Sequence, residues 1–224
     1  MSWAIFSDFD GTLTDKDTID TLVETFLGAE YCRDVTGRLA AGTSTVREVI
    51  SEEFARLRLT PVEMEAFLQR EIRVDPELPA LLREAEARFI PFEILSSGMD
   101  TLILPLLRAA GIDVPVRCNQ LLHDAGAEPC YRIVYRDDSG NGHDKARMLR
   151  RAKAQGWSVI YLGDGITDLA CAREADVLFA RRQLASYCQH HQIPFHALHD
   201  CGDVRRFLLS LPVGEPTRDT TAAR

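Results

Sequence analysis

The chain has 224 residues, a length that suits one full α/β domain with a smaller unit attached to it. Hydrophobic residues make up 46% and charged residues 27%, as in a globular protein with a buried core. The formal net charge of -8 argues against a nucleic-acid-binding protein, because phosphate backbones require clustered Lys and Arg. It is compatible with a small phosphorylated metabolite, which a few local groups can hold.

The first element is predicted as a buried strand that ends in acidic residues. The apolar run 3–7 leads directly into Asp8-Phe9-Asp10-Gly11-Thr12, which is typical of a parallel strand followed by a loop. From about residue 17 to residue 88, apolar residues recur at helical spacing. This region predicts a small helical bundle inserted after the first strand.

Strands and helices alternate after this insertion. Strands are predicted at 92–95, 114–116, 159–162 and 177–180, with a hairpin strand over 130–135. Helices are predicted through 102–107, from residue 145 onward and over 169–175. The alternation predicts an α/β fold with a Rossmann-like open parallel sheet and a helical cap domain inserted after the first strand. The expected division is a core domain of 1–16 and 89–211, a cap of 17–88 and a disordered polar tail of 212–224.

The start of the chain shows no signal-peptide pattern, and no run approaches the roughly 20 apolar residues of a membrane helix. The six cysteines are scattered and form no C-x-x-C pair, which is typical of reduced thiols rather than of a zinc site. We therefore expect a cytoplasmic monomer or homodimer that binds neither membrane nor nucleic acid.

Polar residues are predicted where several strands end, at the edge where open α/β sheets bind their ligands. Each short motif is weak alone, because D-x-D and G-D-G are common turns and a lysine in the first turn of a helix usually faces solvent. Their joint placement at strand ends indicates a single site. The residues are Asp8, Asp10, Thr12, Ser96, Ser97, Lys145, Asp164 and Asp168.

Four motifs follow one another along the chain: D-F-D-G-T, S-S-G, a later lysine and G-D-G-I-T-D. This is their order in the haloacid dehalogenase superfamily of phosphatases, which the chain resembles from about residue 3 to residue 180. The helical insertion stands where the phosphoserine-phosphatase branch carries its cap. Within that branch, residues 8–20 and 94–100 look most like the methionine-salvage phosphatase that acts on 2-hydroxy-3-keto-5-methylthiopentenyl-1-phosphate. The resemblance implies a Mg²⁺-dependent phosphomonoester hydrolase whose cap closes over the site.

Phosphoryl transfer assigns a role to each of these residues. Asp8 is predicted as the nucleophile that forms an aspartyl-phosphate, and Asp10 as the general acid and base. Asp8, the Asp10 carbonyl and Asp164 are predicted to hold Mg²⁺, with Asp168 orienting them. The residues predicted to contact the phosphate or the rest of the substrate are Thr12, Ser96, Ser97, Lys145 and Asp17.

Several alternatives were weighed. A dehalogenase has no leaving oxygen to protonate, so Asp10 argues against one, and a P-type ATPase would need a nucleotide domain and membrane helices. A phosphotransferase and a phosphoserine phosphatase use the same residues and stay open. A catalytically inactive phosphometabolite-binding module would usually lack Asp8 or Asp10.

The exact substrate is left open, because specificity depends on the cap and on the hairpin near Cys130. Glu52 and Glu53 stand at about the place where phosphoserine phosphatases offer an arginine for the substrate carboxylate, and Arg56 follows one turn later. Glutamates would repel a carboxylate, so free phosphoserine is expected to be a poor substrate unless Arg56 restores the contact. Four late histidines fit no standard metal spacing and are expected to be exposed: His190, His191, His196 and His199.

Overall fold

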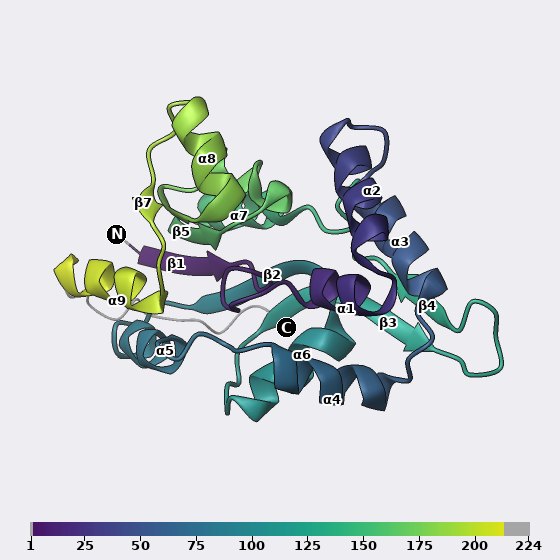
Figure 1. Cartoon of the computed structure of the whole chain (residues 1–224). Coiled ribbons are helices and arrows are strands. Elements are labelled where there is room, and N and C mark those ends of the chain that lie inside the picture. Colours follow the sequence, from purple (N-terminus) through teal and green to yellow (C-terminus); the bar gives the residue numbers. More distant parts are fainter. Residues whose placement is uncertain (1, 213–224) are drawn as a thin grey trace.

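The computed structural model describes residues 2–212 and is built on one seven-stranded open sheet (Figure 1). The strands are β1 (Ser2–Ser7), β2 (Phe92–Met99), β3 (Val116–His123), β4 (Tyr131–Val134), β5 (Trp157–Gly163), β6 (Val177–Ala180) and β7 (His196–Ala197). Their order across the sheet is β4-β3-β2-β1-β5-β6-β7, and neighbouring strands are parallel except in the β3–β4 hairpin. The predicted α/β class is confirmed.

Five of the helices listed below begin where a side chain satisfies a free N–H group of the first turn. Asp17, Thr45, Thr60, Asp144 and Asp200 each accept such a hydrogen bond. The helices are α1 (Thr18–Phe26), α2 (Ala29–Ala40), α3 (Val46–Arg56), α4 (Pro61–Glu71), α5 (Leu78–Ala87), α6 (Asp100–Ala109), α7 (Lys145–Ala154), α8 (Arg182–His190) and α9 (Cys201–Ser210). Within residues 2–212, no helix combines the length and the apolar character needed to cross a bilayer.

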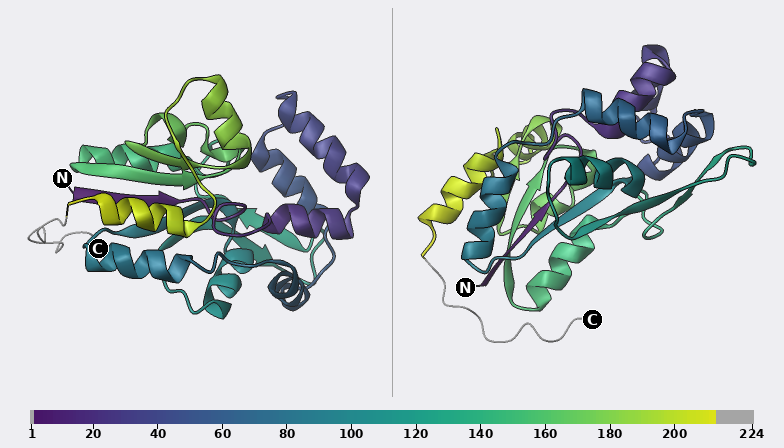
Figure 2. Two further views of the ribbon diagram at one scale, coloured as in Figure 1. Left: turned by 60° about the vertical axis from the view of Figure 1, so that its left-hand side comes forward. Right: turned by 90° about the horizontal axis from the view of Figure 1, so that it is seen from below.

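The two faces of the sheet are covered by different helices, and side chains alternate between the faces along each strand. On β1, Ile5 belongs to the apolar cluster that includes α5, α6 and α9. Its neighbours Ala4 and Phe6 belong to the cluster that includes α7 and α8. Figure 2 shows these helices on opposite sides of the sheet. Burial on both faces explains why β1 appears in the sequence as a continuous apolar run.

The helical insertion after β1 lies beyond the carboxyl end of that strand, where α1, α2 and α3 stand together (Figure 1). Its last helix, α5, packs instead beside α9, with Glu77 3.6 Å from Arg205. The backbone N–H of Cys201 also donates to Asp75 at 2.8 Å. The expected boundary of the cap at residue 88 stays a prediction.

Two predicted elements differ from the structure. The predicted strand 114–116 overlaps the longer strand β3 only at Val116, where β3 begins. Pro115, directly before it, has no N–H to donate. β3 continues into the hairpin with β4. The predicted helix 169–175 is wrong: this segment contains the 3-10 turn Cys171–Arg173, preceded by Ile166–Asp168, because the Asp168 carboxylate binds the chain back onto the loop after β5. Residues 213–224 of the predicted disordered tail lie outside the described residues.

Candidate active site

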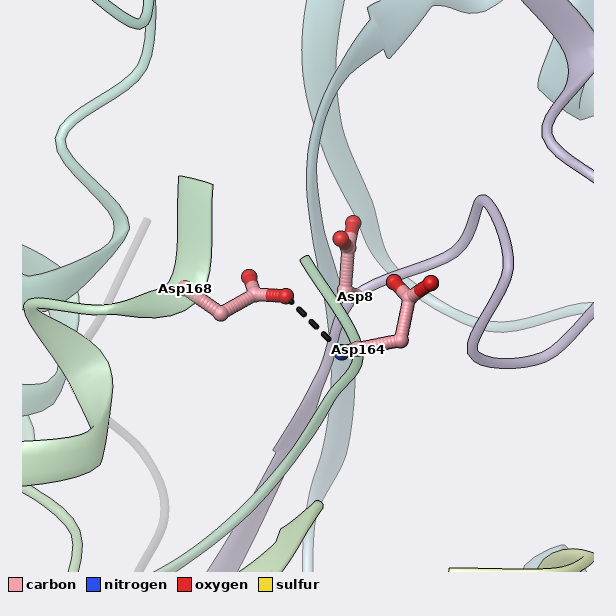
Figure 3. A group of neighbouring side chains, drawn as sticks. All are labelled: Asp8, Asp164 and Asp168. Carbon is pink, nitrogen blue, oxygen red and sulfur yellow. Dashed lines mark hydrogen bonds between the residues drawn. The ribbon is translucent and has the colours of Figure 1, made fainter. Parts of the chain in front are cut away.

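Two neighbouring strands bring acidic residues from distant parts of the sequence together. Asp8 follows β1 and Asp164 follows β5, and the two strands pair in register with Ser7 opposite Leu162. Carboxylate oxygens of Asp8, Asp164 and Asp168 all lie within 4.8 Å of one another. Figure 3 shows the carboxyl groups of Asp8 and Asp164 pointing to the same side. The parallel sheet therefore gathers three of the predicted acidic residues at one point.

Lys145 is the positive charge buried among these acids. Its Nζ lies 2.8 Å from Asp8 Oδ2, 2.8 Å from Asp168 Oδ1 and 3.0 Å from Thr167 Oγ1, and its side chain is 1% exposed. Burial alone would lower the pKa of Lys145, but the charges of Asp168 and Asp8 outweigh burial and hold that pKa above its usual range. Lys145 therefore stays cationic at the point where Asp8 would receive a phosphoryl group.

Asp168 is fully buried and uses both carboxylate oxygens to fix its surroundings. Its Oδ2 accepts from the backbone N–H groups of Asp164 and Gly165 at 3.0 and 3.1 Å (Figure 3). Its Oδ1 accepts from the Tyr161 hydroxyl at 2.6 Å as well as from Lys145. Burial would raise the pKa of Asp168, yet Lys145 and these hydrogen bonds hold it below its usual range. These contacts support the predicted role of orienting the Asp164 loop.

Asp10 lies in the same loop as Asp8 and has a different environment. Its Oδ1 accepts from the backbone N–H of Thr18 at 2.9 Å. Burial raises the pKa of Asp10, and the hydrogen bond from Thr18 offsets this only in part. A Cβ on Gly98 would lie 2.7 Å from Asp10 Oδ2, so only glycine permits this approach. A raised pKa favours the protonated form of Asp10, which is the form that can protonate a leaving group.

The charges of Asp8 and Asp164 are costly in this site. Burial and then the charge of Asp168 raise the pKa of Asp8 well above its usual range. The same two causes raise the pKa of Asp164 to about 6, against the opposing charge of Arg182. A divalent cation would remove this cost, and carboxylate oxygens are ligands that Mg²⁺ prefers. The donor set thus fits the Mg²⁺ site, with the Asp10 carbonyl still a predicted ligand.

Ser96 and Ser97 lie within the second half of β2, and both have hydroxyl groups free to bind a ligand. Ser96 Oγ accepts from the backbone N–H of Gly98 at 2.8 Å, which leaves its proton available for a phosphate oxygen. Ser97 Oγ is buried without a hydrogen-bond partner among the described residues. The Ser97 carbonyl accepts from Asn119 at 2.7 Å, and the Ser96 carbonyl contacts His143 Nδ1 at 3.1 Å. Burial lowers the pKa of His143 to about 4, so this ring is neutral near pH 7.

The remaining two predicted substrate residues make contacts within the protein. The Thr12 hydroxyl donates to Asp164 Oδ1 at 3.1 Å, and its contact with phosphate stays a prediction. Asp17 caps α1 by accepting from the N–H of Asp20 at 2.9 Å. Burial and then the charge of Asp10 raise the pKa of Asp17 well above its usual range. Its contact with substrate stays a prediction.

The cap presents a buried acid that has no partner. Glu53 on α3 is 3% exposed, and its carboxyl has no hydrogen bond or ion pair within residues 2–212. Burial, followed by the charge of Asp20, raises the pKa of Glu53 to about 8. The charge of Asp20 also contributes to the raised pKa of Asp10. Glu53 is therefore largely uncharged near pH 7.

Glu52, the neighbouring acid, is fully engaged. It accepts from Arg38 at 2.9 Å and from the Tyr31 hydroxyl at 3.1 Å, and it pairs with Arg56 at 3.0 Å. The Arg56 guanidinium also lies 4.9 Å from the centre of the Tyr31 ring. Arg56 is thus held by Glu52 and Tyr31. In this position it does not serve as the receptor for a substrate carboxylate, a role that the sequence left open.

The β3–β4 hairpin and the loop after it hold the cap against the core. The Tyr135 hydroxyl lies 2.7 Å from Ser51 Oγ and donates to the Arg47 carbonyl at 2.8 Å. The Arg47 backbone N–H donates to the Gly140 carbonyl at 2.9 Å, and its guanidinium donates to Asp137. We call these contacts of Arg47, Ser51 and Tyr135 the latch.

Sequence reasoning missed several residues that complete the site. Tyr161 lies on a buried strand and could have been noticed as a polar ring two residues before the G-D-G motif. Thr167 lies inside the G-D-G-I-T-D motif, whereas Asn119 and His143 carry no local signal, because each contributes through a partner distant in the sequence. The four late histidines are exposed, as predicted.

Comparisons with known proteins agree with this geometry. The family model for haloacid dehalogenase-like hydrolases matches residues 5–173. The polyol phosphate phosphatase PYP1 of Saccharomyces cerevisiae is 31% identical, with 95% of each chain covered. A 2-hydroxy-3-keto-5-methylthiopentenyl-1-phosphate phosphatase of Bacillus thuringiensis is 29% identical over 94% of this chain and 99% of its own. A substrate-bound phosphoserine phosphatase is similar in fold, with a TM-score of 0.68, 17% identity and 92% and 98% of the two chains covered.

Proposed function

Because the chain belongs to the haloacid dehalogenase-like hydrolases and is a phosphatase acting on a small phosphorylated metabolite, we propose that it hydrolyses phosphate esters of uncharged, hydroxyl-bearing molecules, with Mg²⁺ and an aspartyl-phosphate on Asp8. The observation that carries the chemistry is the group of Asp8, Asp164 and Asp168 around the buried Lys145. The observation that carries the substrate class is the buried Glu53 of the cap, which has no hydrogen bond or ion pair within residues 2–212 and whose raised pKa favours its neutral form.

In the first step, Asp8 attacks the phosphorus atom and the bond from phosphorus to the leaving oxygen breaks. Lys145 and the Ser96 hydroxyl are placed to hold the phosphate oxygens as charge shifts during transfer. When bound, Mg²⁺ supplies further positive charge beside Asp8 and Asp164. Asp10, with its raised pKa, gives its proton to the leaving alkoxide.

In the second step, Asp10 acts as the base. Its carboxylate takes a proton from a water molecule, and the water oxygen attacks the phosphorus of the aspartyl-phosphate. The bond between Asp8 and phosphorus breaks, which releases inorganic phosphate and restores both aspartates. The latch holds the cap near this site, where it limits the entry of bulk water before the intermediate has formed.

The substrate class follows from the charge of the cap. An uncharged Glu53 can donate a hydrogen bond to a hydroxyl oxygen and accept one from a hydroxyl proton, whereas a carboxylate substrate would face Glu53, Asp20 and Asp17. Arg56 is held by Glu52 and gives no compensation. Polyol phosphates present several hydroxyls and are our first candidate. The methylthiopentenyl ester of methionine salvage also lacks a carboxylate and is the second.

The location of the protein is inferred from its thiols. All six cysteines are free, and four of them are buried: Cys118, Cys171, Cys188 and Cys201. Burial raises the pKa of Cys118 to about 12, so this thiol is a structural apolar group and not a reactive one. Free structural thiols support a reducing, cytoplasmic compartment.

The test compares kcat/KM for a hexitol phosphate, the methylthiopentenyl ester and free phosphoserine on one preparation with Mg²⁺. We expect the polyol ester to be best and phosphoserine to be at least about tenfold worse, as one uncompensated charge predicts. A preference for phosphoserine would show that the substrate class is wrong. Adding a polyol acceptor and measuring its phosphorylation separates hydrolase from phosphotransferase, and no turnover of any ester, including an aryl phosphate, would identify a binding module.

A further inference from the structure

Arg182, the first residue of α8, joins two loops of the site. Its Nη1 lies 3.3 Å from Asp164 Oδ2, and its Nη2 donates to the Asp15 carbonyl at 2.6 Å. Asp164 follows β5, whereas Asp15 lies between the nucleophile loop and α1. One side chain from a third segment therefore connects a predicted metal ligand to the entrance of the cap.

The guanidinium lies directly over the nucleophile loop. A Cβ on Gly11 would come within 2.5 Å of Arg182 Nη1 and within 2.3 Å of Asp164 Oδ2. Gly11 has a φ of +68°, which also favours glycine. With the Thr12 hydroxyl on Oδ1, Arg182 completes a pair of donors that hold both oxygens of the Asp164 carboxylate.

Folding stability does not account for an arginine at this position. Arg182 has a φ of +48°, in the left-handed region that is strained for residues other than glycine. Its side chain is 40% exposed, and a half-exposed ion pair adds little to folding stability. The backbone strain is thus not offset by the ion pair, and the two directed hydrogen bonds are what this side chain provides.

We propose that Arg182 is a positioning residue, which fixes the Asp164 carboxylate for Mg²⁺ and holds the Asp15 segment against the same loop. The planar fork of a guanidinium donates to two acceptors in different directions at once, which a lysine ammonium does less well. The backbone supports this arrangement, because Leu184 N–H donates to the Asp164 carbonyl at 2.8 Å. Arg182 orients the site without touching the phosphate.

The test uses three variants of the full chain and needs no substrate. Arg182→Gly removes the side chain and relieves the strain, Arg182→Lys keeps the charge without the fork, and Arg181→Gly is the control. Arg181 carries the same charge one residue earlier, at a φ of -134°, with no side-chain hydrogen bond or ion pair within the described residues. The measurements are the Kd for Mg²⁺ by calorimetry, hydrogen exchange of residues 14–17, and Tm.

We expect Arg182→Gly to raise the Kd for Mg²⁺ about tenfold or more, as loss of a group that orients a metal ligand does. Amides of residues 14–17 should exchange faster, and Tm should stay equal or rise. Arg182→Lys should lose most of the Mg²⁺ affinity, and Arg181→Gly should match wild type. The proposal is overturned by wild-type Mg²⁺ affinity and exchange in Arg182→Gly, by full recovery with lysine, by an equal loss in the control, or by a large fall in Tm.

Discussion

At the scale of single residues, buried neighbours set the protonation state of each group in the site. Lys145 stays charged in a buried position because Asp8 and Asp168 lie 2.8 Å away. Asp10 has a raised pKa, and Lys145 acts on it less strongly than burial does. Asp8 contacts Lys145 whereas Asp10 accepts from Thr18, so the two aspartates of one loop have different neighbours for the attack and the proton transfer predicted for them.

The nucleophile gives the first residue-scale prediction. Asp8→Asn keeps the size of the side chain but removes its charge, so we expect turnover to fall by at least about a thousandfold, as loss of covalent catalysis does. The variant should remain folded, because it removes a buried charge whose pKa is already raised. Steady-state assays with an aryl phosphate and circular dichroism check both points. The matched control is Asp113→Asn on the exposed surface, and a tenth of wild-type activity in Asp8→Asn would contradict the covalent step.

Glu53 gives the second residue-scale prediction. Its pKa is raised to about 8 by burial and by Asp20, so the folded state binds its proton more tightly than the unfolded state does. The resulting stability is complete below the ordinary pKa near 4.5 and is lost as the pH rises through about 8. Glu53→Gln keeps a neutral donor and acceptor, so it should be more stable than wild type at pH 9, by roughly 2–4 kcal/mol at about 1.4 kcal/mol per pKa unit.

Denaturant titrations at pH 5 and pH 9 measure this difference. At pH 5 the two proteins should have similar stability, and turnover of a polyol phosphate should persist in Glu53→Gln. If wild type and Glu53→Gln were equally stable at both pH values, Glu53 would be charged and paired in solution. The control is Glu65→Gln, an acid on α4 that bonds only to Gln69 among the described residues.

At the scale of helices and strands, the cap and the core share one apolar cluster. Phe9 and Leu13 of the core loop belong to the same cluster as Leu22 of α1 and Phe54 of α3. Deleting the whole cap would expose this cluster, so it is a poor test of specificity. The latch is a better place to change the motion of the cap, because its contacts are polar and lie at the edge.

Tyr135→Phe tests the latch. It removes the hydroxyl that lies 2.7 Å from Ser51 Oγ and donates to the Arg47 carbonyl, a change of about 1 kcal/mol in the closed state. We expect KM for a polyol phosphate to rise about fivefold, with little change for a small aryl phosphate that does not need the cap. Tyr187→Phe, on α8, removes the hydroxyl of another half-buried tyrosine and serves as control. Equal effects on both substrates would show that the latch does not govern recognition.

At the scale of the whole molecule, the sequence predicts what repeats or clusters and misses what depends on distant contacts. The strands β1 and β5 were predictable as apolar runs ending in Asp8 and Asp164. Helix α2 was not, because Val35 is its only buried residue and leaves no apolar periodicity. Arg182 could not be predicted, since its role depends on an unusual φ and on partners from two other loops.

The metal links all three scales, and the last prediction concerns its effect on stability. Without a cation, burial and Asp168 raise the pKa of Asp164 to about 6, so the stability that this group provides is lost as the pH rises through 6. Mg²⁺ requires the ionised carboxylate and binds the folded state, so the rise in Tm that it causes should be small at pH 5 and large at pH 8. At a concentration one hundred times Kd, binding stabilises by about 2.7 kcal/mol, or roughly 5–10 °C for a chain of this size.

Thermal unfolding in chelator and in saturating Mg²⁺, each at pH 5, 6.5 and 8, measures this shift without any substrate. Asp164→Asn should abolish the Mg²⁺ effect at every pH, while raising Tm in chelator at pH 8, because it removes a charge that burial opposes. Asp113→Asn again should leave both curves unchanged. A Mg²⁺ shift that is equal at pH 5 and pH 8, or that survives in Asp164→Asn, would place the cation away from the carboxylates that β1 and β5 bring together.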